Sequence, residues 1–228
     1  MSLRFLMSAL RWLLVMLLAS SAGAALAQSE QQKLVNAADT TFSNFMRDPD
    51  MTWLHQKIGR AKGVLIAPEV VKAGFIFGGS GGRAVLVVRD SKSGKWVGPA
   101  FYTLATASVG FQAGVAVSEM LTLVMTEKAL NSLLSDSVKL GPDASIAAGP
   151  VGAGAKADVV TDLVSYSRSK GVYGGINLDG TVVAVSKDWN QGFYQKPVSA
   201  PDILVRMTAR NKGADKLIAD VSRAAGKR

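Results

Sequence analysis

Apolar residues between positions 30 and 62 recur with the period of an amphipathic helix. Their spacing predicts one helix over residues 30–47, which Asp48-Pro49 ends, and a second short helix with Met51, Leu54 and Ile58 on one face. Three basic residues lie toward the end of this second helix, where cations interact favourably with the negative end of the helix dipole: Lys57, Arg60 and Lys62.

From Gly63 onward the pattern changes to the alternation of β-strands. We expect strands at GVLIA, ending at Pro68, and at GFIFGG, RAVLVVRD, AFYTLATA and SVGFQAGVAV. The last of these, residues 108–117, has one apolar face that includes Val115 and Val117. Its other face carries glycine and small residues, which lets a helix, a sheet or a ligand approach the backbone closely.

The second half of the chain predicts a helix at 126–136, a glycine- and proline-rich loop at 140–155 that contains one strand, and strands at LVSYSRS and GVYGGINLDGTVVAV. Asp179-Gly180 predicts a hairpin turn within the last of these segments. The chain becomes helical again after Pro201. We therefore expect an α+β fold: a single domain with a largely antiparallel, bent or barrel-like sheet and helices at both ends of the chain.

The first 27 residues have the features of a secretory signal peptide. Arg4 and Arg11 precede an apolar run, and the segment closes with Ala25-Leu26-Ala27, a cleavage site of the A-x-A type. An uncleaved membrane anchor is the alternative, but the leucine-rich part is too short to span about 30 Å of hydrocarbon. We expect cleavage after Ala27 and a periplasmic or secreted protein. The expected organisation is a signal peptide (1–27), a main domain (28–200) and a basic helical tail (201–228).

Composition narrows the possible functions. The chain has no cysteine and a single histidine, His55, so disulfides, thiolate metal sites and cysteine nucleophiles are excluded. Cleavage would leave 24 basic and 17 acidic residues, a net charge of +7. A basic surface outside the cytoplasm favours anionic lipid or polysaccharide as a ligand over nucleic acid.

The residue spacing of the glycine-rich stretch AGFIFGGSGG, residues 73–82, matches two functional motifs: a dinucleotide-binding loop and a nucleophile elbow. A dinucleotide-binding loop needs a helix directly after the glycines, whereas the β-branched VLVV follows here. A nucleophile elbow at Ser80 needs the same helix and a histidine later in the chain, and His55 comes earlier. We therefore interpret the stretch as a strand that enters a tight glycine corner and leaves along the next strand, with no catalytic role.

Read together, the ordered motifs of the chain resemble the SYLF domain, over roughly Trp53 to Tyr194. The residues that carry this resemblance are Lys62-Gly63, Pro68, Gly74, Trp96 with Pro99-Ala100-Phe101, Ser108-x-Gly110-x-Gln112-x-Gly114, Gly149-Pro150, Tyr166-Ser167, Lys170-Gly171 and Asn190. The resemblance implies binding of anionic phospholipid without enzymatic activity and without a cofactor. Eukaryotic members also contact actin, which an exported bacterial member would not meet.

The resemblance favours lipid contact through basic residues near the N-terminal helices. The expected lipid-binding residues are Lys57, Arg60, Lys62, Lys72, Arg168 and Lys170, although Lys170 also matches the motif and could be structural. The C-terminal tail competes through Arg206, Arg210, Lys212 and Lys216, as a solvated helix docked on the sheet or as a membrane-surface helix. Two other functions stay open: a periplasmic protein-interaction scaffold in envelope maintenance, and a hydrolase that uses Ser80.

Overall fold

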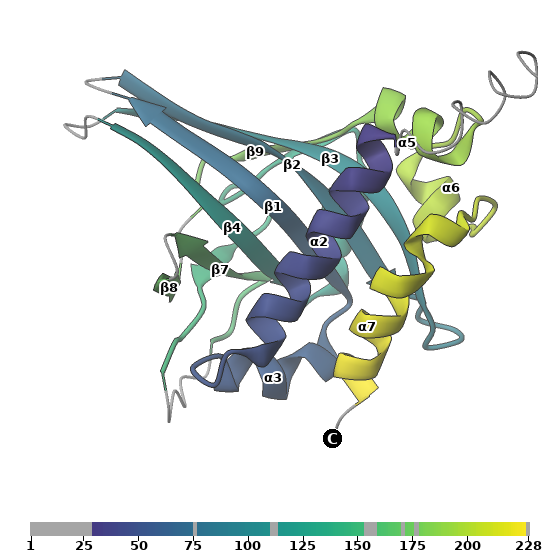
Figure 1. Cartoon of the computed structure of the whole chain (residues 1–228), viewed down its shortest axis with the longest axis horizontal. Coiled ribbons are helices and arrows are strands. Elements are labelled where there is room, and N and C mark those ends of the chain that lie inside the picture. Colours follow the sequence, from purple (N-terminus) through teal and green to yellow (C-terminus); the bar gives the residue numbers. More distant parts are fainter. Residues whose placement is uncertain are drawn as a thin grey trace, which may run out of the picture. The chain divides into compact units, whose positions relative to one another are not determined.

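A curled sheet of long antiparallel strands organises the computed structural model (Figure 1). The structure describes residues 29–74, 77–109, 114–152, 159–169, 172–175 and 178–226. The predicted signal peptide, residues 1–27, and Lys170 lie outside these residues. The described residues from Gln31 onward belong to one compact unit. Within the described ranges, no helix combines the length and the apolar character that crossing a bilayer requires.

The sheet contains all nine strands that the described residues form. Its order is β5-β9-β3-β2-β1-β4-β7-β6, and β8 pairs with β7 at one side. Every pairing is antiparallel except that of β6 with β7. The strands are β1 (Gly63–Gly74), β2 (Phe77–Arg89), β3 (Trp96–Val109), β4 (Gly114–Val124), β5 (Ser137–Lys139), β6 (Ile146–Ala148), β7 (Leu163–Ser169), β8 (Val172–Gly175) and β9 (Val182–Val185).

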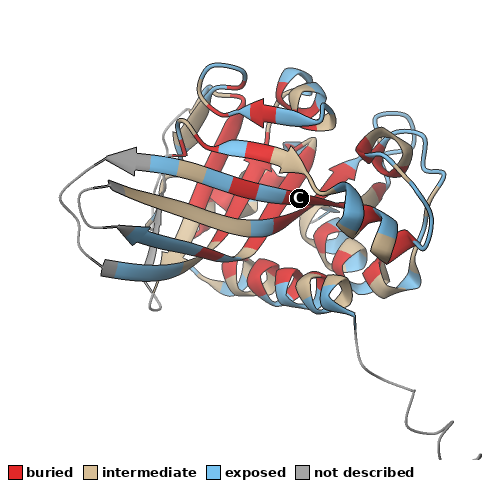
Figure 2. Ribbon diagram, turned by 90° about the horizontal axis from the view of Figure 1, so that it is seen from above, coloured by how far each residue is buried: buried red, intermediate tan, exposed pale blue. Residues whose placement is uncertain are grey.

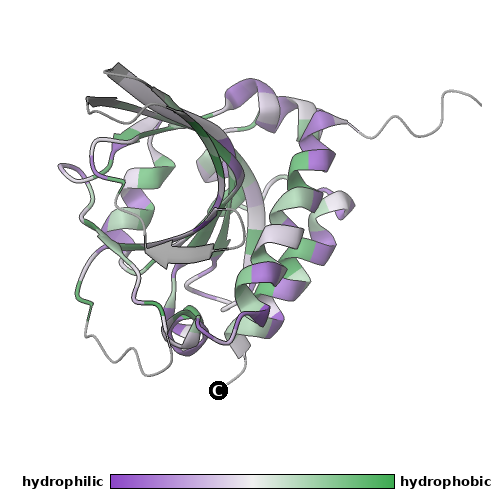
Figure 3. Ribbon diagram, turned by 60° about the vertical axis from the view of Figure 1, so that its left-hand side comes forward, coloured by the Kyte–Doolittle hydropathy of each residue, from purple (hydrophilic) through white to green (hydrophobic). Residues whose placement is uncertain are grey.

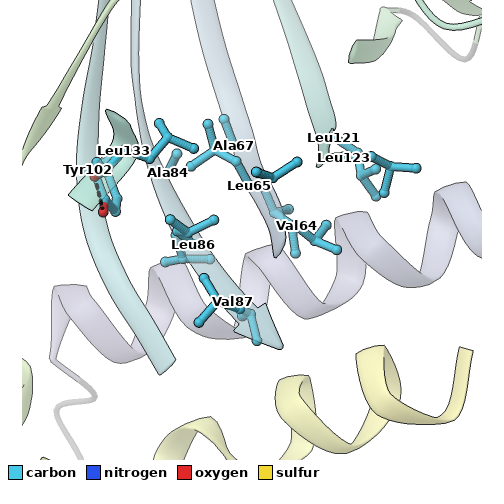
Figure 4. Close-up of a cluster of buried hydrophobic side chains, with 14 of the residues drawn as sticks. Val64, Leu65, Ala67, Ala84, Leu86, Val87, Tyr102, Leu121, Leu123 and Leu133 are labelled. Carbon is cyan, nitrogen blue, oxygen red and sulfur yellow. Dashed lines mark hydrogen bonds between the residues drawn. The ribbon is translucent and has the colours of Figure 1, made fainter. Parts of the chain in front are cut away.

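Helices cover both faces of this sheet. They are α2 (Glu30–Arg47), α3 (Thr52–Lys57), α4 (Glu127–Leu134), α5 (Lys187–Tyr194), α6 (Ala200–Leu204) and α7 (Asp215–Gly226), with 3-10 turns η1 (Ile58–Arg60) and η2 (Lys212–Ala214). On one face, Thr41 of α2 bonds to Glu119 of β4, and Trp189 of α5 packs against Phe101 of β3. On the other face, the Tyr102 hydroxyl donates to the Leu133 carbonyl of α4 at 2.8 Å (Figure 4). The predicted α+β fold with a bent, largely antiparallel sheet is confirmed.

The core fills the space between the helices and the central part of the sheet. Alternate side chains of one strand enter opposite layers, so β1 contributes Val64 to one layer and Leu65 to the other (Figure 4). The green, apolar stripes of the helices turn toward the sheet in Figure 3. Burial is concentrated there, whereas the coloured outer parts of the four long strands are mainly tan and pale blue in Figure 2. Among the described residues, no helix covers this end of the sheet.

Two predicted strand boundaries are wrong. β1 runs through Pro68 to Gly74, because a bulge between Ile66 and Val70 places the proline where a missing N–H is tolerated. The predicted strand 108–117 is divided, since β3 ends at Val109 and β4 begins at Gly114. The alternation of apolar and small residues continues across residues 110–113, which lie outside the described residues, so periodicity alone could not reveal the boundary.

The glycines Gly78–Gly82 and the turn at Asp179-Gly180 also differ from expectation. The glycines form part of β2 itself instead of a corner before it. Asp179-Gly180 is a turn, with Gly180 at a φ of 79°, but the strands on either side do not pair with each other. β8 pairs with β7, whereas β9 pairs with β3 and β5. The two strands thus pair with other strands of the sheet instead of with each other.

Candidate functional site

The first group of predicted lipid-binding residues surrounds α3 and η1, at the end of the molecule from which β1 starts (Figure 1). Lys57 lies in the last turn of α3, with its ammonium group 5.8 Å from the centre of the Trp53 ring. Arg60 closes η1 and is exposed. Neither Lys57 nor Arg60 forms an ion pair with an acidic residue that the structure describes. Lys62 pairs with Glu127 at 3.0 Å, and both side chains are substantially exposed.

Arg47 adds a cation to this end that the sequence analysis did not single out. It is the last residue of α2, is exposed, and has no ion-pair partner among the described residues. With His55, Lys216, Arg223 and the acid Asp220 it lines a cleft of about 440 Å³ between α2, α3 and α7. We define Arg47, Lys57 and Arg60 as the α3-end cations. None of the three is paired with a described acidic residue, so this end can attract an anion.

Lys72 does not join the α3-end cations. It is exposed near the outer end of β1, ten residues beyond Lys62. A strand rises about 3.3 Å per residue, which puts the two lysine backbones about 30 Å apart. The structure therefore divides the predicted set between opposite ends of one strand.

Arg168 is held in the interior of a polar network. β7 pairs with β4 so that Arg168 lies opposite Glu119, and the two side chains form an ion pair. Glu119 also accepts a hydrogen bond of 2.9 Å from Thr41 Oγ1, which ties α2 to the sheet. Arg168 is only 27% exposed at its side chain. Its contacts are those of a residue that holds elements together.

Three of the four competing tail cations pair with neighbouring acids, whereas Lys212 has no ion-pair partner among the described residues. Arg206 pairs with Asp202 at 2.6 Å, and Arg210 pairs with Asp215 at 3.3 Å. Lys216 pairs with both Asp39 of α2 and Asp220 of its own helix. The apolar side of α7 is buried through Leu217 and Val221, as expected for a helix docked on the core.

Asp39 of α2 forms an ion pair with Lys216 of α7 where the two helices meet. Burial raises the pKa of this carboxyl, and the hydrogen bond from Lys216 opposes that rise. The hydrogen bonds to Asp220 and Asp39 in turn raise the pKa of Lys216. This lysine is engaged within the fold and is a poor candidate for contact with a membrane.

Ser80 and His55 lie in different parts of the molecule. Ser80 sits inside β2, opposite Lys72 of β1 and Thr106 of β3. The strand continues to Arg89, so the strand-to-helix turn of a nucleophile elbow is missing at Ser80. His55 lies in α3, half-buried, with Nε2 3.3 Å from the Phe45 carbonyl oxygen.

The environments of two further groups of residues were not predicted from the sequence. Asn190 is fully buried and accepts a hydrogen bond from the Phe101 backbone N–H at 2.9 Å, which ties α5 to β3. Its place in the family-like motif was the only signal for it. Val71, Val115 and Val117 remain exposed at the outer ends of β1 and β4. The predicted apolar face of residues 108–117 included Val115 and Val117. The sequence did not predict that these two side chains are exposed.

Comparison with known proteins gives a consistent picture. A family model described as Ysc84, Las17-binding protein actin regulator, matches residues 105–224. Protein YSC84 of Saccharomyces cerevisiae is 32% identical over 166 residues, which cover 70% of this chain and 35% of that protein. SH3 domain-containing YSC84-like protein 1 of Homo sapiens is 30% identical over 174 residues, 74% of this chain and 50% of that protein. The chain thus spans between a third and a half of these relatives. No solved structure matches.

Proposed function

The chain belongs to the Ysc84 (SYLF) family, and from this we propose that it is a non-enzymatic protein that binds the surface of anionic phospholipid membranes. One observation carries the proposal: the α3-end cations, Arg47, Lys57 and Arg60, have no acidic partner among the described residues. Of the four tail cations, Arg206, Arg210 and Lys216 are paired, and Lys212 alone has no acidic partner among the described residues. The two basic groups, which the sequence left in competition, therefore differ in the charge that they offer to a ligand.

The strength of this contact follows from the number of available cations. Each lysine or arginine near an anionic membrane contributes about 1 kcal/mol, so three give weak, reversible attachment. Lys62 is not counted among them, because it pairs with Glu127 as the tail cations pair with their own acids. Binding should weaken strongly with salt, since the Debye length falls from about 10 Å at 0.1 M to about 3 Å at 1 M.

Flotation with phosphatidylglycerol vesicles tests this function. The protein is purified after export, its N-terminus is read by mass spectrometry, and phosphatidylcholine vesicles serve as the neutral comparison. We expect the triple variant Lys57→Glu, Arg60→Glu, Lys62→Glu to float far less than the unaltered protein at low salt. The matched control is Arg206→Glu with Arg210→Glu, which reverses exposed charges of the tail. A triple variant that unfolds at the normal temperature and floats as well as the unaltered protein would contradict the assignment.

A protein partner is the second candidate function. The matching family is described as Las17-binding, and a relative is named LAS seventeen-binding protein 3. An exported chain would need a different partner, so we propose a scaffold role in envelope maintenance as the alternative. Pull-down from envelope extracts separates the two functions: a stoichiometric protein partner, together with indifference to vesicles, would favour the scaffold.

Export and the absence of catalysis are also proposals with direct tests. We expect a mature N-terminus at Gln28 and a periplasmic or secreted protein that associates with membranes peripherally. Retention of Met1 or Ser2 would instead indicate an N-terminal anchor. Assays with p-nitrophenyl esters test the hydrolase alternative, and turnover that is lost in Ser80→Ala would overturn the non-enzymatic assignment.

A further inference from the structure

The outer ends of β1, β2, β3 and β4 form a sheet with one apolar face. In the register of the sheet, Val117, Val71, Gly81 and Ala105 lie side by side in one row. Val115, Ala73, Gly79 and Ala107 form the next row. Residues directly opposite each other on paired strands point to the same side, and so do residues two apart on one strand, so both rows share one face. We call these eight residues the apolar sheet face.

This face is exposed although all of its side chains are apolar. Val115 is 72% exposed, Val117 50% and Val71 37%, and the alanines of both rows are also exposed. The same side of the sheet is covered by α2 and α5 nearer the core, and the strands extend beyond these helices (Figures 1 and 2). A polar row of Glu69, Arg83 and Thr103 separates the covered part from the exposed part.

The opposite side of the same strands is more polar. Lys72 lies there between Ala116 and Ser80, and Thr106 follows Ser80 in the same row. Arg83, in the polar row that ends the apolar sheet face, stacks at 4.0 Å on the ring of Trp189. The sheet end is therefore amphipathic, with two cations, Lys72 and Arg83, and one acid, Glu69, beside its apolar surface. This combination suits the boundary between anionic headgroups and acyl chains.

The size of the face argues against a protein as its cover. Four strands spaced about 4.8 Å apart and two rows of side chains give an area of roughly 250 Å². A stable protein interface needs about 800 Å² from each partner. A second copy of this chain would thus gain too little contact here. A bilayer has no such threshold, because a few inserted side chains add to electrostatic attraction.

We infer that the apolar sheet face is a second membrane-contact surface, which inserts Val71, Val115 and Val117 into the headgroup region of an anionic bilayer. The inference rests on the proposed lipid-binding function and adds to it a surface at the opposite end of β1 from the α3-end cations. Because the two surfaces lie far apart, variants of one leave the other intact.

Fluorescent labelling reports insertion directly. The chain lacks cysteine, so one cysteine at a time can be introduced and labelled with an environment-sensitive fluorophore. We expect labels at Val115→Cys and Val117→Cys to shift to shorter wavelength with phosphatidylglycerol vesicles. The control is Val160→Cys, at a site that is 96% exposed outside the apolar sheet face, and its label should not shift. Labels at Val115 and Val117 that stay unshifted while the protein floats with vesicles would overturn the inference.

A binding assay provides the second measurement. Val115→Asp with Val117→Asp should reduce the vesicle-bound fraction at least fivefold, whereas Val160→Asp with Val205→Asp should not. Val115→Thr with Val117→Thr keeps side-chain shape and strand preference, and we expect a smaller loss in the same direction. Unchanged flotation of the aspartate pair would overturn the apolar sheet face and leave the lipid-binding function standing. Failure of the unaltered protein to float would remove both. A dimer in sedimentation that the aspartate pair dissociates would show that a second copy covers the face.

Discussion

Gly82 is expected to be among the positions of the sheet where the smallest side chain does the greatest damage. It lies in β2 opposite the bulge of β1, and a Cβ added to Gly82 would lie 2.3 Å from the Glu69 carbonyl oxygen and 3.2 Å from the Val70 Cα. Both contacts are with backbone, which cannot rotate away as a side chain can. β2 is also paired with β3 on its other side, so a shift would strain two ladders.

The neighbouring residue provides a matched control. A Cβ on Gly81 would point to the opposite face, where its nearest atom is the Leu104 carbonyl oxygen at 3.4 Å. For Gly82→Ala we expect a loss of about 3 kcal/mol, the upper part of the range for overpacking, because strand hydrogen bonds must give way. For Gly81→Ala the lower backbone entropy of alanine in the unfolded chain predicts a gain of up to about 1 kcal/mol.

Thermal unfolding followed by circular dichroism separates the two outcomes. In a domain of this size 1 kcal/mol corresponds to about 2–4 °C, so Gly82→Ala should lower Tm by about 6–12 °C. Gly81→Ala should leave Tm unchanged or raise it by up to about 4 °C. If both variants unfold at the same temperature as the unaltered protein, the close approach of β1 and β2 at the bulge is not as tight as the structure has it, and the reasoning fails.

Three further variants test other parts of the fold by urea unfolding. The Asp162 carboxylate accepts four hydrogen bonds, one of them of 2.6 Å from Thr126 Oγ1. Asp162→Asn weakens these bonds and should lower the free energy of unfolding by about 2 kcal/mol at pH 7. The hydrogen bond from Thr126 is the main cause that holds the pKa of Asp162 below its ordinary 3.8, and the other three bonds add to it. The stabilisation that this carboxylate provides is therefore present above about pH 4 and lost on further acidification. Equal acid sensitivity of the variant and the unaltered protein would contradict this. Asn190→Ala leaves the buried N–H of Phe101 without its hydrogen-bond acceptor and should lower the free energy of unfolding by about 2–3 kcal/mol. An unchanged free energy of unfolding would count against that hydrogen bond. Gln195→Gly relieves a φ of 55° after α5 and should stabilise by up to about 1 kcal/mol, with destabilisation as the contrary outcome.

The local periodicity of the sequence determined the elements near the chain ends and the class of the fold. The helical spacing around Leu34, Ala38 and Phe42 gave α2 with its observed limits, because an amphipathic helix carries its own signature within about four turns. The alternation of RAVLVVRD likewise identified the second half of β2. The apolar stripe of α7 was recognised in the same way, and Leu217 and Val221 are buried as that stripe requires.

The candidate site needed the tertiary structure, because pairing between distant residues decides it. From the sequence alone, Lys57, Lys72 and Arg168 are equivalent candidates. In the structure Lys57 and Lys72 lie near opposite ends of β1, and Arg168 forms an ion pair with Glu119 on a neighbouring strand. Nothing in the local pattern around Arg168 indicates that Glu119 lies opposite it.

Long-range pairing also decided the strand boundaries and the exposed surface. β9 leaves its sequence neighbour β8 for β3 and β5, which the turn at Asp179-Gly180 could not foretell. Val115 and Val117 have the alternation of a buried strand face, but burial depends on where the helices end relative to the sheet. A periodic pattern determines which side chains share a face, while only the packing of other elements against that face determines whether water reaches it.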